Sequence, residues 1–248
     1  MSQLEDSARR FGGVSRLYGT GSQARAAAAH CVVVGIGGVG SWAVEALARS
    51  GIGELTLIDL DHIAESNINR QIHALEDTLG MAKVEAMKAR VLAINPACRI
   101  HAVDEFIDEQ NVATLIPPCN GVIDAIDNVR AKAALIAHCQ RNGIRIVTTG
   151  GAGGRRDPSK IEVLDLSRTT QDALASKVRA KLRKDYGFSR DPKRKFGIEC
   201  VFSPEQIVRP VGSSDQGLSC AGYGSAVTVT ASFGFIAAAR SLAGILQP

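Results

Sequence analysis

The stretch CVVVGIGGVGSWAVEALARSG, residues 31–51, decides the fold of this chain. Its first residues form an apolar run that is typical of a buried strand, and the following SWAVEALARSG indicates a helix. Between them, Gly35, Gly37 and Gly40 fit the pattern G-x-G-x-x-G. Such glycines permit a tight turn, let the backbone approach a phosphate and let the helix pack on the strand. Because free N–H groups at a helix start attract anions, the stretch predicts a nucleotide-phosphate site.

The rest of the chain alternates strand-like and helix-like segments, which favours α/β layering. With 248 residues, 45% of them apolar, the chain can bury a sizeable core. We predict one domain with a Rossmann-like, mostly parallel sheet and helices on both faces. Residues 1–165 are expected to form the nucleotide-binding core, and residues 166–248 a basic segment and a C-terminal extension. Arg240 and several polar residues interrupt the apolar stretch 225–246, which favours a buried or interface helix over a membrane span.

The N-terminal residues and the cysteines both bear on the cellular location of the protein. The first ten residues, MSQLEDSARR, contain no apolar core that could serve as a signal peptide. No C-x-x-C pair occurs, so neither a disulfide framework nor a four-cysteine zinc site is indicated. We therefore expect a cytoplasmic protein whose cysteines are mostly reduced and in several cases buried. The six are Cys31, Cys98, Cys119, Cys139, Cys200 and Cys220.

A second strand, ELTLIDLD, carries an acidic residue where a dinucleotide site needs one. Asp59 lies 19 residues beyond Gly40, at a position suited to accept hydrogen bonds from ribose hydroxyls. Up to this point, an oxidoreductase that binds NAD accounts for every feature of the sequence.

The next segment favours a triphosphate over NAD. The run NINRQ places Asn67, Asn69, Arg70 and Gln71 just after the acidic strand end, and GMAK places Lys83 at a helix start. A dehydrogenase does not need the two cations of this set, Arg70 and Lys83. ATP does when pyrophosphate leaves, because charge builds on its β- and γ-phosphates and Arg and Lys can stabilise that charge.

A further carboxylate follows the strand GVIDAID, which we expect to end at Asp127 and Asn128. A carboxylate at the carboxyl end of such a strand faces the crevice where α/β proteins bind ligands, and it suits Mg²⁺ bridged to phosphates. The alternative is that Asp127 only caps the following helix.

Taken in order, GIGGVGS, LIDLD, NINRQ, GMAK and DAIDN resemble the superfamily of ubiquitin-activating enzymes and their bacterial relatives (ThiF, MoeB and HesA), over about residues 10–165. The resemblance implies ATP-dependent adenylation of a carboxylate, with Arg70, Lys83 and Asp127 in catalysis and Asp127 on Mg²⁺. The residues that it implies for ATP binding are Gly35, Gly37, Gly38, Gly40, Asp59, Asn67, Asn69, Arg70, Gln71, Lys83, Asp127 and Asn128.

The resemblance also implies a homodimer in which an arginine finger reaches the ATP of the partner subunit. In the family this residue lies in an N-terminal segment like R-[YF]-x-R. The corresponding segment here, RRFGGVSRLYG, is spaced differently. Arg16 is our first candidate for the catalytic arginine and Arg10 the second.

The second half of the chain narrows the resemblance. It contains VTTGGAGG, GIECVFSPE and LSCAGYGSAVTVTASFGF, and it lacks the two C-x-x-C pairs that many activators of sulfur carriers have. This set resembles the bacterial tRNA threonylcarbamoyladenosine dehydratases. The implied reaction adenylates the carboxylate of N6-threonylcarbamoyladenosine in tRNA, after which a carbamoyl atom closes on the activated carbonyl and expels AMP. The implied cofactors are ATP, Mg²⁺ and a monovalent cation, Na⁺ or K⁺, and a sulfur-relay protein is an implied partner.

Two other classes of function remain open from the sequence. One is an adenylyltransferase that activates the C-terminus of a ubiquitin-like sulfur-carrier protein. The other is an NAD oxidoreductase or a nucleotide-binding module without this chemistry. The missing zinc pairs count against the first, and the Asn, Arg, Lys and Asp set counts against the second.

The net charge of +4 comes from one segment, residues 176–195, which holds nine Lys or Arg and two Asp. Elsewhere, 20 basic residues face 23 acidic ones. Such a run is either a solvated surface or a docking patch for a polyanion. The resemblance to enzymes of tRNA favours the docking patch, since phosphate contacts supply affinity without reading sequence. The predicted RNA-binding residues are Lys181, Arg183, Lys184, Lys193, Arg194 and Lys195.

Two cysteines need separate consideration. A cysteine takes over the acyl group from the adenylate in some members of the superfamily, and Cys220 lies between small residues that suit a loop. A free cysteine is more commonly a small buried thiol. The residues favour that role for Cys200 and also for Cys220, which we nevertheless keep as a catalytic candidate.

Overall fold

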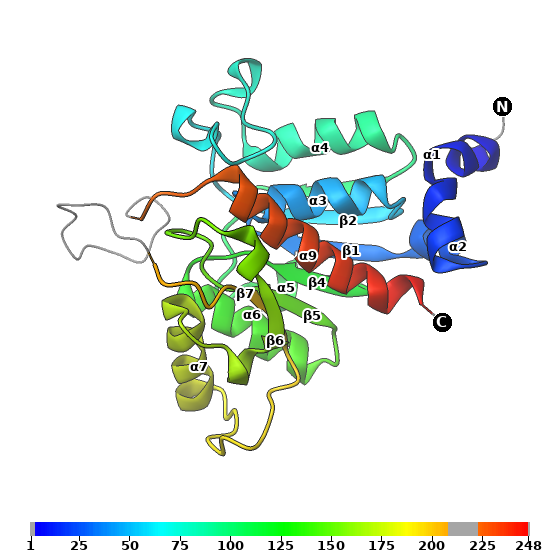
Figure 1. The fold of residues 1–248 in the computed structure, drawn as a ribbon. Coiled ribbons are helices and arrows are strands. Elements are labelled where there is room, and N and C mark those ends of the chain that lie inside the picture. Colours follow the sequence, from blue (N-terminus) through cyan, green and yellow to red (C-terminus); the bar gives the residue numbers. More distant parts are fainter. Residues whose placement is uncertain (1–2, 208–222, 248) are drawn as a thin grey trace.

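The structure is a computed structural model that describes residues 3–207 and 223–247. Its strands form one seven-stranded sheet with helices on both faces (Figure 1). The strands are β1 His30–Val34, β2 Glu54–Ile58, β3 Arg99–Val103, β4 Gly121–Asp124, β5 Ile146–Thr149, β6 Glu162–Asp165 and β7 Glu199–Phe202. The helices are α1 Gln3–Tyr18, α2 Ser22–Ala28, α3 Gly40–Arg49, α4 Lys83–Ile94, α5 Val112–Leu115, α6 Val129–Arg141, α7 Ala173–Asp185 and α9 Val227–Leu246. Short 3₁₀ helices are η1 Glu65–Asn67, η2 Glu76–Thr78, η3 Pro158–Lys160 and η4 Leu166–Arg168.

The strand order is β3-β2-β1-β4-β5-β7-β6, and every neighbouring pair is parallel except β6 and β7. This confirms the predicted α/β fold with a mostly parallel sheet. The order reverses between β1 and β4, and ligands of such sheets bind in the crevice at that reversal, outside the carboxyl ends of the strands. Val34 pairs with both Ile58 and Asp124. The three strands therefore end level, and the residues that follow them meet at one edge.

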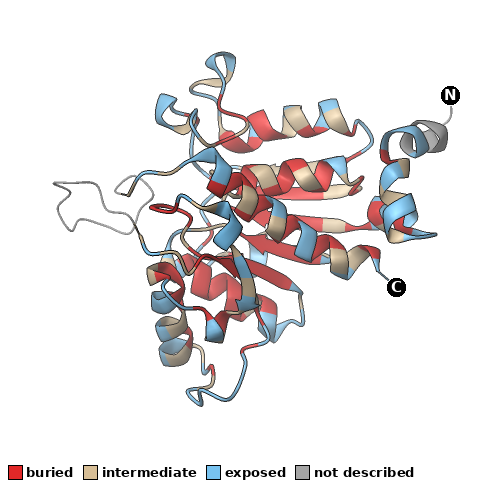
Figure 2. Ribbon diagram, viewed as in Figure 1, coloured by how far each residue is buried: buried red, intermediate tan, exposed pale blue. Residues whose placement is uncertain are grey.

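Alternation along the strands divides the core into two layers (Figure 2). Val33 and Leu55 point to the face that α3, α4 and α9 cover, and Val32 and Val34 point to the face that α5, α6 and α7 cover. β7 and α9, which come from residues 166–248, complete the same sheet and the same helical layer as the first half of the chain.

The C-terminal helix α9 is a core helix, as the interrupted apolar pattern predicts. Its length and composition would allow it to cross a membrane, but 56% of its most apolar 18 residues are buried inside the protein. At Gly234 it lies so close to α3 that an added Cβ would be 2.4 Å from the carbonyl oxygen of Val39. Near its end, Arg25 Nε donates a 3.1 Å hydrogen bond to the carbonyl of Leu246.

The strand β4 is shorter than the sequence indicates. It ends at Asp124 rather than at Asp127 and Asn128. The Asp124 carboxylate accepts a hydrogen bond from the backbone N–H of Ile126, and Lys132 Nζ donates to the carbonyls of Asp124 and Ile126. Since these groups are taken by side chains, the backbone leaves the ladder three residues early and forms a loop.

The N-terminal helices α1 and α2 lie at the amino ends of the strands. The backbone N–H of Gly53, just before β2, donates to the carbonyl of Ala26, and that of Glu54, the first residue of β2, donates to the carbonyl of Ala29. Arg10, in α1, donates to the carbonyl of Ile94 at the end of α4. Figure 1 shows both helices at the end of the sheet opposite the crevice.

Candidate functional site

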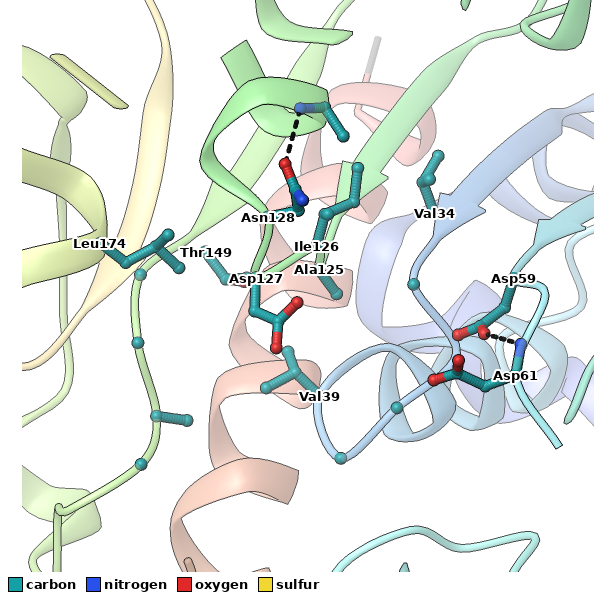
Figure 3. A pocket seen from close by; sticks show the side chains of 18 of the residues that line it. Val34, Val39, Asp59, Asp61, Ala125, Ile126, Asp127, Asn128, Thr149 and Leu174 are labelled. Carbon is teal, nitrogen blue, oxygen red and sulfur yellow. Dashed lines mark hydrogen bonds between the residues drawn. The ribbon is translucent and has the colours of Figure 1, made fainter. Parts of the chain in front are cut away.

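A cavity of about 850 Å³ opens at the carboxyl ends of β1, β2, β4 and β5 (Figure 3). This is the switch point of the sheet, and the volume lies in the range of small-molecule sites. One side is lined by the glycine loop after β1 and by polar residues after β2. The other side is lined by the loop after β5 and the start of α7. The predicted residues that line it are Gly35, Gly37, Gly38, Asp59, Asn67, Arg70, Gln71, Lys83, Asp127 and Asn128.

The glycine loop is held in place by contacts that tolerate no side chain. A Cβ at Gly40 would lie 1.8 Å from the carbonyl oxygen of Gly35, which is the close approach of helix to strand that the pattern predicts. Gly35 has φ of 86°, and a Cβ there would meet the carbonyl of Ala125 at 2.8 Å. No described side chain caps the start of α3. The N–H of Ser41 donates to the carbonyl of Gly37, and neither Gly40 nor Ser41 lines the cavity. An anion would therefore meet the loop residues before the helix, Gly37–Val39, which do line it.

Asp59 and Lys83 form a buried charged wall beside this loop. Asp59 Oδ2 accepts a 2.6 Å hydrogen bond from the N–H of Ile36, and its Oδ1 accepts one of 2.8 Å from the N–H of Asp61. The Lys83 ammonium lies 2.6 Å from Asp61 Oδ2 and 3.9 Å from Asp59 Oδ1. Burial raises the pKa of the Asp59 carboxyl, and the charge of Lys83 opposes that rise. The carboxylate is thus oriented by backbone groups, with lone pairs left for ribose hydroxyls.

The polar run after β2 is only partly directed to the cavity. The aliphatic part of Arg70 covers Gly38, and its guanidinium donates to the Ser66 carbonyl at 2.7 Å. Gln71 is buried, and its Oε1 has no hydrogen-bond partner among the described residues. Asn69 differs from the prediction: it does not line the cavity, and its amide donates to the carbonyl of Ser225 at 2.9 Å.

Asp127 and Asn128 occupy the loop between β4 and α6. Figure 3 shows the Asp127 carboxylate projecting into the space between Asp59 and Thr149. The residue that caps α6 is Asn128, whose side chain accepts hydrogen bonds from the N–H groups of Arg130 and Ala131. Asp127 is therefore free of the capping role. The described residues contain no group of three or more His, Cys, Asp and Glu side chains that could hold a metal ion. A single carboxylate still suits Mg²⁺, which takes most of its ligands from water and phosphates.

A buried ion pair that sequence reasoning missed supports the Asp127 loop. Lys132 Nζ lies 2.9 Å from Asp124 Oδ1, and both side chains are at most 1% exposed. Thr148 donates a 2.6 Å hydrogen bond to the other carboxylate oxygen. Since Lys132 also binds two carbonyls of the loop, the pair fixes the backbone that carries Asp127. An Asp inside the apolar run GVID was the only signal of this pair.

The far side of the cavity comes from the glycine-rich loop after β5. Gly150–Gly153 line it together with Arg155, Leu174, Ile207 and Tyr223. The Asp172 carboxylate accepts hydrogen bonds from the N–H of Gly151, at 2.9 Å, and of Ala175, at 2.8 Å. The loop is thereby tied to the start of α7. The sequence presents this loop as VTTGGAGG, one of the motifs of the second half of the chain, but it does not single out Arg155 or Asp172.

The basic segment forms α7 and the loop that follows it. Lys181 is paired with Glu109 at 3.1 Å and with Asp185 at 2.9 Å, and the Arg183 guanidinium lies over the ring of Phe196. The other predicted RNA-binding residues are exposed: Lys184, Lys193, Arg194 and Lys195. The start of α7 lines the cavity, so its 13 residues place the basic loop about 20 Å away.

The candidates outside the cavity are the cysteines and the N-terminal arginines. Cys200 is fully buried in β7, and burial raises the pKa of its thiol, which confirms the role of a core residue. Cys220 lies outside the described residues. Arg16 is in the last turn of α1, at the amino ends of the strands. Neither Arg16 nor Arg10 can therefore reach the cavity of its own chain.

This geometry matches known proteins along the whole chain. The model of the ThiF family matches residues 12–247. The chain belongs to the ThiF family. The chain is similar in structure to the tRNA N6-threonylcarbamoyladenosine dehydratase of Escherichia coli, whose crystal structure in complex with ATP has a TM-score of 0.89 and 52% sequence identity to this chain. The match covers 95% of this chain and 93% of that one. A structure of the same E. coli protein in complex with AMP has a TM-score of 0.88.

Curated proteins are similar in sequence as well. The tRNA threonylcarbamoyladenosine dehydratase of Haemophilus influenzae is 51% identical, over all of this chain and 97% of its own length. The molybdopterin-synthase adenylyltransferase of the same organism is 35% identical, but over 54% of this chain and 55% of its own length. The similarity to the dehydratases thus includes the second half of the fold.

The wall of the site predicts a pH dependence of stability. His73 is buried near Lys83, and burial, followed by the charges of Lys83 and Arg90, lowers its pKa to about 4. Below pH 6.5, His73 therefore binds a proton in the unfolded chain but stays neutral in the folded protein. Stability is lost as the pH falls towards 4. Between pH 7 and pH 5, the free energy of unfolding should fall by about 2 kcal/mol more than in His73→Leu.

Urea denaturation at both pH values measures this difference. The comparison uses the change with pH within each protein, so a difference in their stabilities at pH 7 does not affect it. Parallel pH curves for the two proteins would contradict a neutral, buried His73.

Proposed function

We propose that this protein catalyses the ATP-dependent dehydration of N6-threonylcarbamoyladenosine in tRNA by adenylating its carboxylate. The observation that carries the proposal is the similarity to dehydratases of this name over essentially the full length of both chains. The cavity supports it independently, because it combines a phosphate-binding loop, a ribose acceptor and cations for a triphosphate in one space.

ATP is proposed to lie along the near side of the cavity, which the glycine loop and the polar residues after β2 line. Asp59 would accept the ribose hydroxyls, and the glycine loop would bind the phosphates. Arg70 lies against Gly38 of that loop and Lys83 lines the same cavity, and both are proposed to stabilise the charge of the leaving pyrophosphate. Gln71 has a buried amide oxygen free for a donor on the nucleotide.

Asp127 is the residue proposed to hold Mg²⁺. Its carboxylate projects into the cavity from a loop that the Lys132–Asp124 pair fixes. When bound, Mg²⁺ would neutralise charge on the phosphates. The monovalent cation implied by the family resemblance stays a prediction without assigned residues.

The proposed reaction has two steps, adenylation of the carboxylate and ring closure. A carboxylate oxygen of the modified nucleoside forms a bond to the α-phosphorus of ATP, and the bond from that phosphorus to the pyrophosphate oxygen breaks. A carbamoyl atom then bonds to the activated carbonyl carbon, the carbamoyl group loses an N–H proton to solvent, and AMP leaves with the original carboxylate oxygen. The nucleophile of the second step belongs to the substrate itself, so the protein only has to position it. Such positioning lowers the activation free energy by several kcal/mol, and by on the order of 7 kcal/mol or more in the best-oriented cases.

The tRNA is proposed to contact the basic loop while its modified nucleoside enters the cavity. The distance of about 20 Å along α7 suits contacts to phosphates of the stem rather than to the reacting nucleoside. Lys184, Lys193, Arg194 and Lys195 are exposed and suited to these contacts. Lys181 and Arg183 are already engaged within the protein.

The remaining proposals concern assembly and location. We propose a homodimer in which Arg16, or else Arg10, acts on the ATP of the partner subunit, since neither can reach its own. A sulfur-relay partner and a cytoplasmic location also stay predictions. Activation of a ubiquitin-like sulfur carrier is the weaker alternative, because the adenylyltransferase relative matches only about half of this chain.

The test of the function is a turnover assay with Asp127→Asn. The wild-type protein, ATP, Mg²⁺ and tRNA that carries the modified nucleoside should give AMP and a nucleoside lighter by one water, measured by mass spectrometry. Asp127→Asn should lower the rate about 100-fold or more, because a group that stabilises transition-state charge is lost. Its melting curve should stay unchanged, since Asp127 is exposed.

Asp104→Asn is the matched control. Asp104 is also exposed and directly follows a strand, β3, but it does not line the cavity. Its turnover should match that of the wild type. If the wild-type protein leaves the mass of the nucleoside unchanged, the proposed function is wrong. If Asp127→Asn turns over normally, the metal site is misplaced.

The basic loop gives a separate prediction about tRNA. Replacing Lys184, Lys193, Arg194 and Lys195 with Gln should weaken tRNA binding and flatten its dependence on salt, because fewer counterions are released. Lys181→Gln should change the salt dependence little, since acids already balance that charge. Filter binding at several salt concentrations measures both, with ATP affinity as the control for folding. An unchanged slope in the fourfold variant would move the RNA contact elsewhere.

A further inference from the structure

One buried cation in the cavity has no partner for most of its donors. Arg155 lines the far side and is 3% exposed. Its Nη2 donates a 2.8 Å hydrogen bond to the carbonyl of Gln171, but its Nε and Nη1 have no hydrogen-bond partner among the described residues. Leaving a buried charged group without hydrogen bonds is costly, so such groups in folded proteins are paired or bind a ligand.

The carboxylates of Asp172 and Glu205 act on Arg155 through their charge, but neither forms a hydrogen bond with it. Both oxygens of the nearby Asp172 carboxylate accept backbone N–H groups, from Gly151 and Ala175. Glu205 accepts the N–H groups of Arg156 and Asp157. No acid within ion-pair distance of Arg155 is found in residues 3–207 and 223–247. Burial lowers the pKa of the guanidinium, but an arginine keeps its charge at neutral pH.

The backbone around Arg155 is shaped for this arrangement. Gln171, whose carbonyl holds the guanidinium, has φ of 56°, a conformation that no other described residue except glycine adopts. It lies directly before Asp172, which is tied to Gly151. A Cβ at Gly150 would be 2.1 Å from the Asp172 carboxylate, so the loop and the start of α7 fit together closely. Strain of this kind persists where the surrounding structure enforces it, often at ligand sites.

Arg155 lies on the side of the cavity away from the proposed ribose site. Asp59 follows β2, the glycine loop follows β1, Asp127 follows β4 and the Arg155 loop follows β5, in the order of these strands across the sheet. Neighbouring strands are about 4.8 Å apart, so the loop after β5 begins about 10 Å from the glycine loop. Figure 3 agrees: Asp127 lies between Asp59 on one side and Thr149 and Leu174 on the other.

We propose that Arg155 binds the carboxylate of the nucleoside that is to be adenylated. The inference rests on the proposed function. It assigns the side of the cavity after β5 to the nucleoside that is to be adenylated. The unpartnered Nε and Nη1 are covered in this structure, and they can donate charge-assisted hydrogen bonds once Gly150–Gly153 admit a carboxylate beside Leu174. One carboxylate oxygen held in this way leaves the other directed to the phosphate beside Asp127.

The burial of Arg155 decides between a carboxylate and the phosphates of the tRNA backbone. A polynucleotide backbone cannot enter a cavity to a side chain that is 97% buried, whereas an anion at the end of a flexible arm can. The ATP phosphates have separate donors on the near side. Arg156, the next residue, is exposed and does not line the cavity, so it provides a matched control.

The experiment compares binding of the free modified nucleoside with that of its methyl ester, which lacks the negative charge. Each competes with tRNA in the presence of an ATP analogue that has a methylene group between the α- and β-phosphorus. The wild-type protein and Arg156→Gln should prefer the acid by about 10- to 100-fold. Arg155→Gln should bind acid and ester about equally, Arg155→Lys should give an intermediate preference, and the Kd for ATP should change less than about 2-fold in every variant.

The other outcomes separate the two proposals. A wild-type protein that dehydrates the tRNA, with Arg155→Gln still preferring the acid, would overturn the role of Arg155 and leave the function standing. Loss of ATP affinity in Arg155→Gln and Arg155→Lys would make Arg155 a phosphate ligand instead. A wild-type protein with neither turnover nor preference would overturn both. If Arg155→Gln does not fold, Arg155→Lys decides, because a preference equal to that of the wild type would contradict the proposal.

Discussion

The approach of α3 to β1 is the constraint on which the site depends. With only 1.8 Å between an added Cβ at Gly40 and the carbonyl oxygen of Gly35, no other residue allows the helix to start where it does. The glycine loop and Val39, the N-cap residue of α3, thereby line the crevice. The N–H of Ile36, within the same turn, orients the Asp59 carboxylate of the neighbouring strand. A single turn therefore positions both the proposed phosphate site and the proposed ribose acceptor.

Much of the fold follows from local patterns in the sequence. The apolar run at β1, the glycines and the acidic end of β2 each depend on a few neighbouring residues, and together they predict the parallel sheet and its crevice. The end of β4 could not be predicted in the same way. It depends on Lys132, which reaches back from α6 to take carbonyls at Asp124 and Ile126, and a sequence shows no such contact.

At the site, the sequence likewise predicts the segments better than the positions of single side chains. Arg155 and Arg156 are adjacent and chemically identical, and only the fold separates a buried residue in the cavity from an exposed one outside it. Among the predicted RNA-binding residues, Lys181 and Lys184 differ because Glu109, far away in the sequence, pairs with the first. Asn69 lies in the right segment, but its amide turns towards Ser225. Spacing predicts which segments meet, whereas the direction of each side chain is set by tertiary contacts.

The transfer of a carboxylate oxygen to AMP tests the central claim, adenylation of a carboxylate in this crevice, most directly. The substrate is tRNA whose N6-threonylcarbamoyladenosine carries ¹⁸O in the carboxylate, incubated with the protein, ATP and Mg²⁺ in ordinary water. If the carboxylate attacks the α-phosphorus and AMP then leaves, the AMP recovered should carry one ¹⁸O in its phosphate. If AMP contains only oxygen from ATP and water while the nucleoside keeps its label, ATP is being hydrolysed without adenylation, and the account is contradicted.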